Sequence, residues 1–158
     1  MATAETTDTL RRLVERYRRG RIAAHIAACG ALFLLALALC VPALFVYDNA
    51  VRRSIDHPRV LLAAVVLSLL TVIVYSIIHR KRFGGFGAAV RELDERYRMG
   101  FALRSYFEFG TDPSETEQRF RDGFAERMRG AEFSPLRYWN EARRIARWAA
   151  VGWGGILL

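Results

Sequence analysis

The chain has few of the residues and clusters from which disulfides, metal centres and catalytic sites are built. Only one of its 24 basic residues is a lysine, Lys81, and its two cysteines, Cys29 and Cys40, lie within one apolar run. A separation of 11 residues is about 16 Å along a helix, too far for a disulfide between them. No Cys/His cluster has zinc-site spacing, and neither apolar run contains an acidic residue. We therefore predict no disulfide framework, no metal centre and no catalytic set.

Two uncharged apolar runs dominate the first half of the chain, at residues 22–47 and 60–78. Their 26 and 19 residues would form helices of about 39 and 28 Å, against a hydrocarbon core of about 30 Å. With the polar loop 48–59 between them, they predict an all-α integral membrane protein built on a transmembrane hairpin. The first run is too long for a cleaved signal. The lipoprotein-like box Ile26-Ala27-Ala28-Cys29 follows Arg21 too closely to be cleaved.

The distribution of basic residues predicts the orientation of the hairpin. Six arginines precede the first run, three lie in the loop, and three basic residues follow the second run at once. By the positive-inside rule, both ends of the hairpin face the cytoplasm of a bacterium and the loop lies outside the inner membrane. The net charge of +8 flanks apolar runs, so it favours anionic lipid headgroups over nucleic acid. The predicted headgroup contacts are Arg18, Arg19, Arg21, Arg80, Lys81 and Arg82.

Two similar arginine-rich segments, residues 10–20 and 90–100, flank the hairpin. Seven of ten positions agree when the segments are aligned at an offset of 80. The first falls in a basic amphipathic helix over 1–21, and each is expected to end at a glycine cap, Gly20 or Gly100. We predict that the two helices lie on the cytoplasmic side and pack together.

The remaining cytoplasmic region, 79–147, is predicted to be helical, after a glycine-rich joint at 83–87. Asp112-Pro113 predicts a helix start, with Asp112 as cap, and Asp56 is the predicted cap of the second apolar helix. The acids of this region, Glu92 among them, alternate with arginines as on a solvated helix surface. Residues 148–158 carry no charge and predict the start of a third membrane helix that is cut short, or a C-terminus that dips into the membrane.

Few residues in or directly beside the apolar runs could bind a cofactor or take part in a reaction. His25 and His79 are both expected near the cytoplasmic surface. They predict either a haem, relay or quinone site, or interface histidines without a cofactor. The second run has a polar seam of Ser68, Thr71 and Tyr75, whose hydroxyls could instead bond within the helix pair. Small and hydroxyl residues favour close helix packing in lipid; the predicted packing residues are Ala23, Ala27, Gly30, Ala31, Ser68 and Thr71.

After the second run come Leu93-Asp94-Glu95-Arg96-Tyr97 and Leu103-Arg104-Ser105-Tyr106-Phe107. In this order of parts the chain resembles the N-terminal membrane unit of large uncharacterised bacterial inner-membrane proteins with a long helical region outside the cytoplasm. Gly100-Phe101 stands where that family often has Gly-Leu, and the family's threonine is absent. The resemblance implies no enzymatic activity and a third span completed further along.

Our leading hypothesis is a non-enzymatic anchor or scaffold subunit without a cofactor, which docks other membrane or cytoplasmic proteins or a second copy of itself. The alternative is a haem, quinone or transport subunit that uses His25, His79 and the polar seam.

Overall fold

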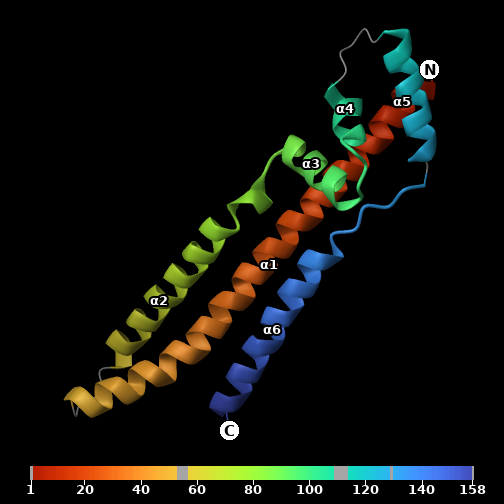
Figure 1. Ribbon diagram of the computed structural model, residues 1–158. Coiled ribbons are helices and arrows are strands. Elements are labelled where there is room, and N and C mark those ends of the chain that lie inside the picture. Colours follow the sequence, from red (N-terminus) through yellow and green to blue (C-terminus); the bar gives the residue numbers. More distant parts are fainter. Residues whose placement is uncertain (1, 53–56, 109–113, 129, 158) are drawn as a thin grey trace. The chain divides into compact units, whose positions relative to one another are not determined.

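The computed structural model describes residues 2–52, 57–108, 114–128 and 130–157, and every regular element within these ranges is a helix. The predicted all-α class is therefore confirmed. The chain forms two compact units: unit 1 is Met1–Arg21 with Phe83–Pro135, and unit 2 is Ile22–Arg82 with Leu136–Leu158. The elements are labelled in Figure 1: α1 (Ala2–Arg52), α2 (His57–Ile78), the 3-10 helix η1 (Arg80–Phe83), α3 (Phe86–Arg96), α4 (Ala102–Glu108), α5 (Glu115–Arg127) and α6 (Leu136–Leu157).

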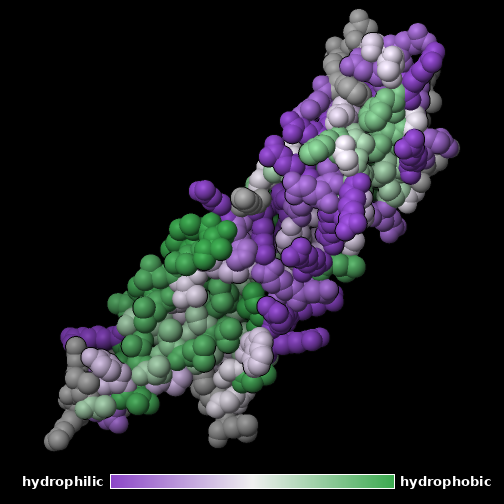
Figure 2. Space-filling model, viewed as in Figure 1, coloured by the Kyte–Doolittle hydropathy of each residue, from purple (hydrophilic) through white to green (hydrophobic). Residues whose placement is uncertain are grey.

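Within the described ranges, two helices are long and apolar enough to cross a membrane, over Thr7–Ala50 and Pro58–Ile78. Hydrophobic residues cover the visible face of α2 (Figure 2). Large apolar side chains are exposed along its whole length: Leu61, Leu62, Val65, Val66, Leu67, Leu69, Leu70, Ile73, Val74, Ile77 and Ile78. A continuous apolar surface of this kind is typical of a helix that faces lipid or a partner.

The last helix of unit 2, α6, packs against the apolar part of α1. The indole Nε1 of Trp153 donates a hydrogen bond to the Leu34 carbonyl at 3.1 Å. A Cβ added to Gly152 would lie 3.4 Å from the Cβ of Ala38, so small residues allow the two helices to approach closely here. The stretch predicted as a third membrane helix is thus the end of a helix that begins at Leu136.

Helix α1 is one helix where the sequence predicted a surface helix followed by a span. It continues through Gly20 and Pro42 to Arg52, so the prediction that Gly20 caps a helix is wrong. Glycine at position 20 instead allows close packing against Pro135, because a Cβ there would lie 2.8 Å from the Cγ of Pro135. The predicted loop is correspondingly shorter, and the proposed cap Asp56 lies outside the described residues.

Unit 1 has an apolar core of its own. The carboxylate of Asp94 on α3 accepts hydrogen bonds from the backbone N–H groups of Leu103 at 2.9 Å and Arg104 at 2.8 Å, which caps the first turn of α4. The similar segments 10–20 and 90–100 both contribute to the core. Its buried apolar residues include Leu10, Val14, Tyr17, Ala89, Val90, Leu93, Leu103, Tyr106 and Phe124.

Two helix ends differ from the sequence-based expectation. Helix α3 ends at Arg96, and Gly100 instead takes a left-handed φ of +58° in the turn that leads to α4. Helix α5 is capped by Ser114, whose Oγ accepts from the Glu117 N–H while the Glu117 carboxylate accepts from the Ser114 N–H. The prediction of Asp112 as cap is therefore wrong by two residues, and Asp112 itself lies outside the described residues.

Candidate functional site

Three aromatic rings meet in unit 2, from His25 on α1, from Tyr75 on α2 and from His79 in the turn directly after α2; we call these residues the ring cluster. The His25 and Tyr75 rings are nearly parallel, at 9° with centroids 5.3 Å apart. The Tyr75 and His79 centroids are 4.3 Å apart, since residues one turn apart share a helix face. The two histidine centroids lie 6.2 Å apart. The histidines that the sequence singled out therefore lie close together, with Tyr75 against both.

The Tyr75 hydroxyl connects the ring cluster to an ion pair. It donates a hydrogen bond to Glu141 Oε1 on α6 at 2.8 Å, and Arg82 Nη1 donates to the same hydroxyl at 3.0 Å. Arg82 Nη2 lies 2.7 Å from Glu141 Oε2. Burial tends to raise the pKa of Glu141, but the hydrogen bonds from Arg82 and Tyr75 outweigh it and hold that pKa below its usual value. This Tyr75–Arg82–Glu141 triad ties α2 and η1 to α6.

One ring nitrogen of each histidine already has a polar neighbour in the folded chain. His79 Nδ1 lies 3.0 Å from the Tyr75 carbonyl oxygen, which can only accept, so Nδ1 carries a proton. His25 Nε2 lies 3.6 Å from Cys29 Sγ, which is also 3.5 Å from Ser76 Oγ on α2. Within the described residues, no group of three or more His, Cys, Asp or Glu side chains could hold a metal ion. The arrangement serves best as a polar junction between helices.

The rest of the predicted polar seam bonds within its own helix. Ser68 Oγ donates to the Ala64 carbonyl at 2.8 Å, and Thr71 Oγ1 donates to the Leu67 carbonyl at 2.9 Å. Such bonds satisfy a hydroxyl without a partner helix, whereas Tyr75 bonds across to α6. Ser68 is fully buried. Of the three seam hydroxyls, those of Ser68 and Thr71 therefore bond within α2, and that of Tyr75 bonds to α6.

The small residues of α1 fall on two faces. Ala24 and Ala28 are buried, and with His25 they form the internal contact face of the helix. Three of the four small residues predicted for packing are exposed, and the fourth is half-buried: Ala23, Ala27, Gly30 and Ala31. The predicted packing face is thus left open within a single chain.

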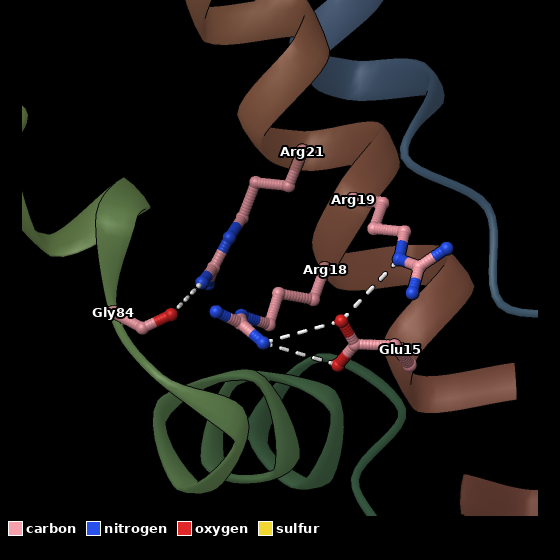
Figure 3. Close-up of polar contacts among 5 residues, drawn as sticks. All are labelled: Glu15, Arg18, Arg19, Arg21 and Gly84. Atoms are coloured by element: carbon pink, nitrogen blue, oxygen red, sulfur yellow. Dashed lines mark hydrogen bonds and ion pairs between the residues drawn. The ribbon is translucent and has the colours of Figure 1, made fainter. Parts of the chain in front are cut away.

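Arg21 departs from its predicted role in contacting lipid headgroups. Its side chain is only 1 % exposed, and its guanidinium forms an ion pair with Glu92 on α3. It also donates to the Gly84 carbonyl at 3.1 Å (Figure 3). The Tyr17 hydroxyl donates to Glu92 Oε1 at 2.6 Å. We call Tyr17, Arg21 and Glu92 the Arg21 network, and it joins α1 to α3 inside unit 1.

The two arginines before Arg21 have a different environment. Arg18 Nη1 lies 3.2 Å from both carboxylate oxygens of Glu15, and Arg19 Nε lies 3.4 Å from one of them (Figure 3). Arg19 is 81 % exposed, so this pairing leaves it accessible. The prediction that Arg18 and Arg19 contact headgroups remains open.

Two acidic residues, Glu92 and Glu141, form ion pairs between helices that their sequence pattern did not predict. Glu92 was expected on a solvated helix surface, but it pairs with a buried arginine. Glu141 was not singled out, although it is the only acidic residue after residue 134. Arg82, predicted to contact headgroups, forms an ion pair with Glu141. Arg80 is exposed, and the side chain of Lys81 lies outside the described residues.

Comparison of the chain with models of protein families, with curated protein sequences and with solved structures found no match. In the part of the chain that the structure describes, the residues define an all-helical protein with two helices long and apolar enough to cross a membrane. Any more particular assignment rests on the physical features of the site.

Proposed function

We propose that the chain is a multi-pass protein of a bacterial inner membrane, with both ends of its hairpin in the cytoplasm. Its function is that of a non-enzymatic anchor or scaffold that docks other membrane or cytoplasmic proteins. The observation that carries this proposal is the exposed apolar surface of α2. No charged residue interrupts the chain from residue 60 to residue 78, and large apolar side chains stay exposed all along it.

The size of that surface supports insertion into lipid. Each exposed Leu, Ile or Val near the centre of a membrane helix favours insertion by about 0.3–0.6 kcal/mol. If all eleven exposed apolar residues of α2 counted as central, they would together supply about 3–7 kcal/mol. The internal hydrogen bonds of Ser68 and Thr71 remove the cost of two unbonded hydroxyls in hydrocarbon.

Extraction from membranes tests the anchor role. The protein should remain in the membrane pellet after an alkaline carbonate wash and dissolve only in detergent. Leu69→Arg/Ile73→Arg places two charges at the centre of α2, each opposed by about 2.5–3.5 kcal/mol, so a larger fraction of this variant than of the unaltered protein should be extracted. Leu69→Ala/Ile73→Ala is the matched control and should stay in the pellet. Release of the unaltered protein by carbonate would contradict membrane integration.

The open small-residue face of α1 supports the docking role. Ala23, Ala27 and Gly30 are exposed, and a Cβ on Gly30 would meet nothing within 4 Å. In lipid, small residues at this spacing allow a second helix to approach closely. The occupant is a transmembrane helix of another subunit or of a second copy of the chain.

Bulky substitutions on this face test docking. In native membranes, Gly30→Leu should reduce chemical crosslinking of the protein to neighbouring membrane subunits or to itself at least fivefold. Ala63→Leu makes a similar increase in volume on an exposed part of α2, and it should leave crosslinking unchanged. Equal effects of the two variants would argue against docking through the α1 face.

One observation favours a second candidate function, the binding of haem or quinone. The His25 and His79 rings lie 6.2 Å apart at their centroids. Against it, His25 Nε2 faces Cys29, and Tyr75 packs on both rings. The scaffold proposal predicts no Soret band in protein purified from haem-supplemented cells. A Soret band that disappears in both His25→Ala and His79→Ala would replace it.

A further inference from the structure

A cavity of about 670 Å³ opens within unit 1, among the first turns of α1 and the helices α3, α4 and α5. Its volume falls in the range of about 300–1,000 Å³ that is common for small-molecule sites. The residues that line it come from distant parts of the sequence, which the fold of a single unit brings together. None of the described residues that line the cavity belongs to the ring cluster or to the face proposed for docking.

The charge of the cavity is strongly positive. Four arginines line it, one from each helix: Arg11, Arg91, Arg104 and Arg121. Among the described residues that line it, Glu108 is the one carboxylate, and it accepts a hydrogen bond from Arg104 Nε at 2.6 Å. Four arginines against one carboxylate leave a net positive charge on this concave surface, which favours the binding of an anion.

The cavity also has an aromatic wall made of Phe86, Tyr106 and Phe107. The Phe86 and Phe107 rings pack edge to face with centroids 5.0 Å apart, and Tyr106 packs edge to face on Phe107 at 5.4 Å. The Arg11 guanidinium lies 6.0 Å from the centroid of Phe86, and the Arg121 guanidinium lies 6.0 Å from that of Tyr106. Aromatic contacts of this kind restrict where a guanidinium can point.

We propose that this cavity binds an organic phosphate, with the arginines on the phosphate group and the organic part against the aromatic wall. Guanidinium groups match phosphate oxygens with paired hydrogen bonds, which favours phosphate over a simple halide ion. The volume exceeds that of inorganic phosphate, and the apolar wall would stay unused by it. A soluble nucleotide and a glycerophospholipid headgroup share this chemistry, and both are candidates.

Titration of the full-length protein in a neutral detergent tests the proposal without reference to the membrane anchor. The probes are adenosine monophosphate, inorganic phosphate, and short-chain phosphatidylglycerol compared with phosphatidylcholine, each followed by calorimetry. We expect adenosine monophosphate or phosphatidylglycerol to bind at least tenfold more tightly than inorganic phosphate. Binding of the nucleotide alone identifies a soluble ligand, and binding of phosphatidylglycerol alone identifies a lipid. Failure of every phosphate probe to bind would overturn the proposal, whatever the outcome of the membrane tests.

Charge variants separate a specific site from general attraction to a basic protein. Arg11→Gln/Arg91→Gln should weaken binding of the probe at least tenfold. Arg12→Gln/Arg119→Gln removes the same charge from exposed positions that do not line the cavity, and it should change affinity less than twofold. Equal losses in the two double variants would overturn the proposal.

A variant that fills the cavity gives a test that leaves the charge unchanged. Gly87 lines the cavity, and a Cβ there would meet nothing within 4 Å. Gly87→Leu should therefore weaken binding at least fivefold. Gly123→Leu adds the same side chain to another open glycine in unit 1 that does not line the cavity, and it should bind normally. Unchanged affinity in Gly87→Leu would place the ligand elsewhere and contradict the proposal.

Discussion

The pairing of buried Arg21 with Glu92 allows a quantitative test of how unit 1 is held together. The Arg21 side chain is 1 % exposed, whereas that of Glu92 is 26 % exposed. Removing one partner of a buried ion pair costs about 3–5 kcal/mol, because the other charge is left without compensation. Water can reach part of this pair, so we expect Glu92→Ala to destabilise the contact between α1 and α3 by about 2–4 kcal/mol.

Hydrogen exchange of the α3 amides measures this loss directly. Since 1.4 kcal/mol corresponds to a factor of ten, Glu92→Ala should lower protection in α3 about 30- to 700-fold, as local opening becomes easier. Glu95→Ala is the matched control, because Glu95 lies on the same helix and is exposed. Arg21→Met/Glu92→Leu removes both charges and should recover most of the protection. A loss in Glu92→Ala no larger than in Glu95→Ala would refute the reasoning.

Three further predictions concern individual contacts. Gly20→Ala should lower the melting temperature by an amount equivalent to about 1–3 kcal/mol, because its new Cβ would clash with Pro135. Gly123→Ala adds a Cβ in open space inside α5, so it should raise stability by about 0.5–1 kcal/mol. Ser114→Ala removes the capping box, so it should increase hydrogen exchange in the first turn of α5 about fivefold, equivalent to about 1 kcal/mol. Thr116→Ala in the same turn should leave hydrogen exchange unchanged. Because the pKa of Glu141 is lowered in the folded state, its carboxylate stabilises the fold fully above the usual carboxyl pKa of 4.5, and this stabilisation is lost as the pH falls through the lower pKa of the folded state. Thermal melts should therefore show that the stability of the unaltered protein declines below about pH 4.5, and that it declines less steeply in Glu141→Gln.

Hydrophobic patterning was sufficient to predict helix α2. An uncharged run over 60–78 becomes the helix His57–Ile78, because every backbone group of such a run can bond within one helix. Whether the helix ends at Gly20 or continues through it could not be judged from the sequence. A glycine inside a helix costs only about 1 kcal/mol, and close packing against a proline more than a hundred residues away requires it there.

The candidate sites were less predictable than the helices. His25 and His79 were chosen from the sequence and do lie close together, because both fall near the same end of neighbouring helices. Glu92 and Glu95 look alike in the sequence, yet only Glu92 meets buried Arg21, which depends on how α1 and α3 pack. The arginines of the phosphate cavity are spread over 110 residues, so no local motif could reveal them.

The orientation of the hairpin is the central claim, and labelling of a single cysteine tests it most directly. In a background of Cys29→Ala/Cys40→Ala, Ser54→Cys places a thiol in the predicted outer loop, and Glu132→Cys places one in the predicted cytoplasmic region. A membrane-impermeant maleimide applied to intact cells should label the Ser54→Cys protein and should label Glu132→Cys only after the cells are permeabilised. The reverse pattern, or labelling of neither before permeabilisation, would contradict a hairpin whose loop lies outside the inner membrane.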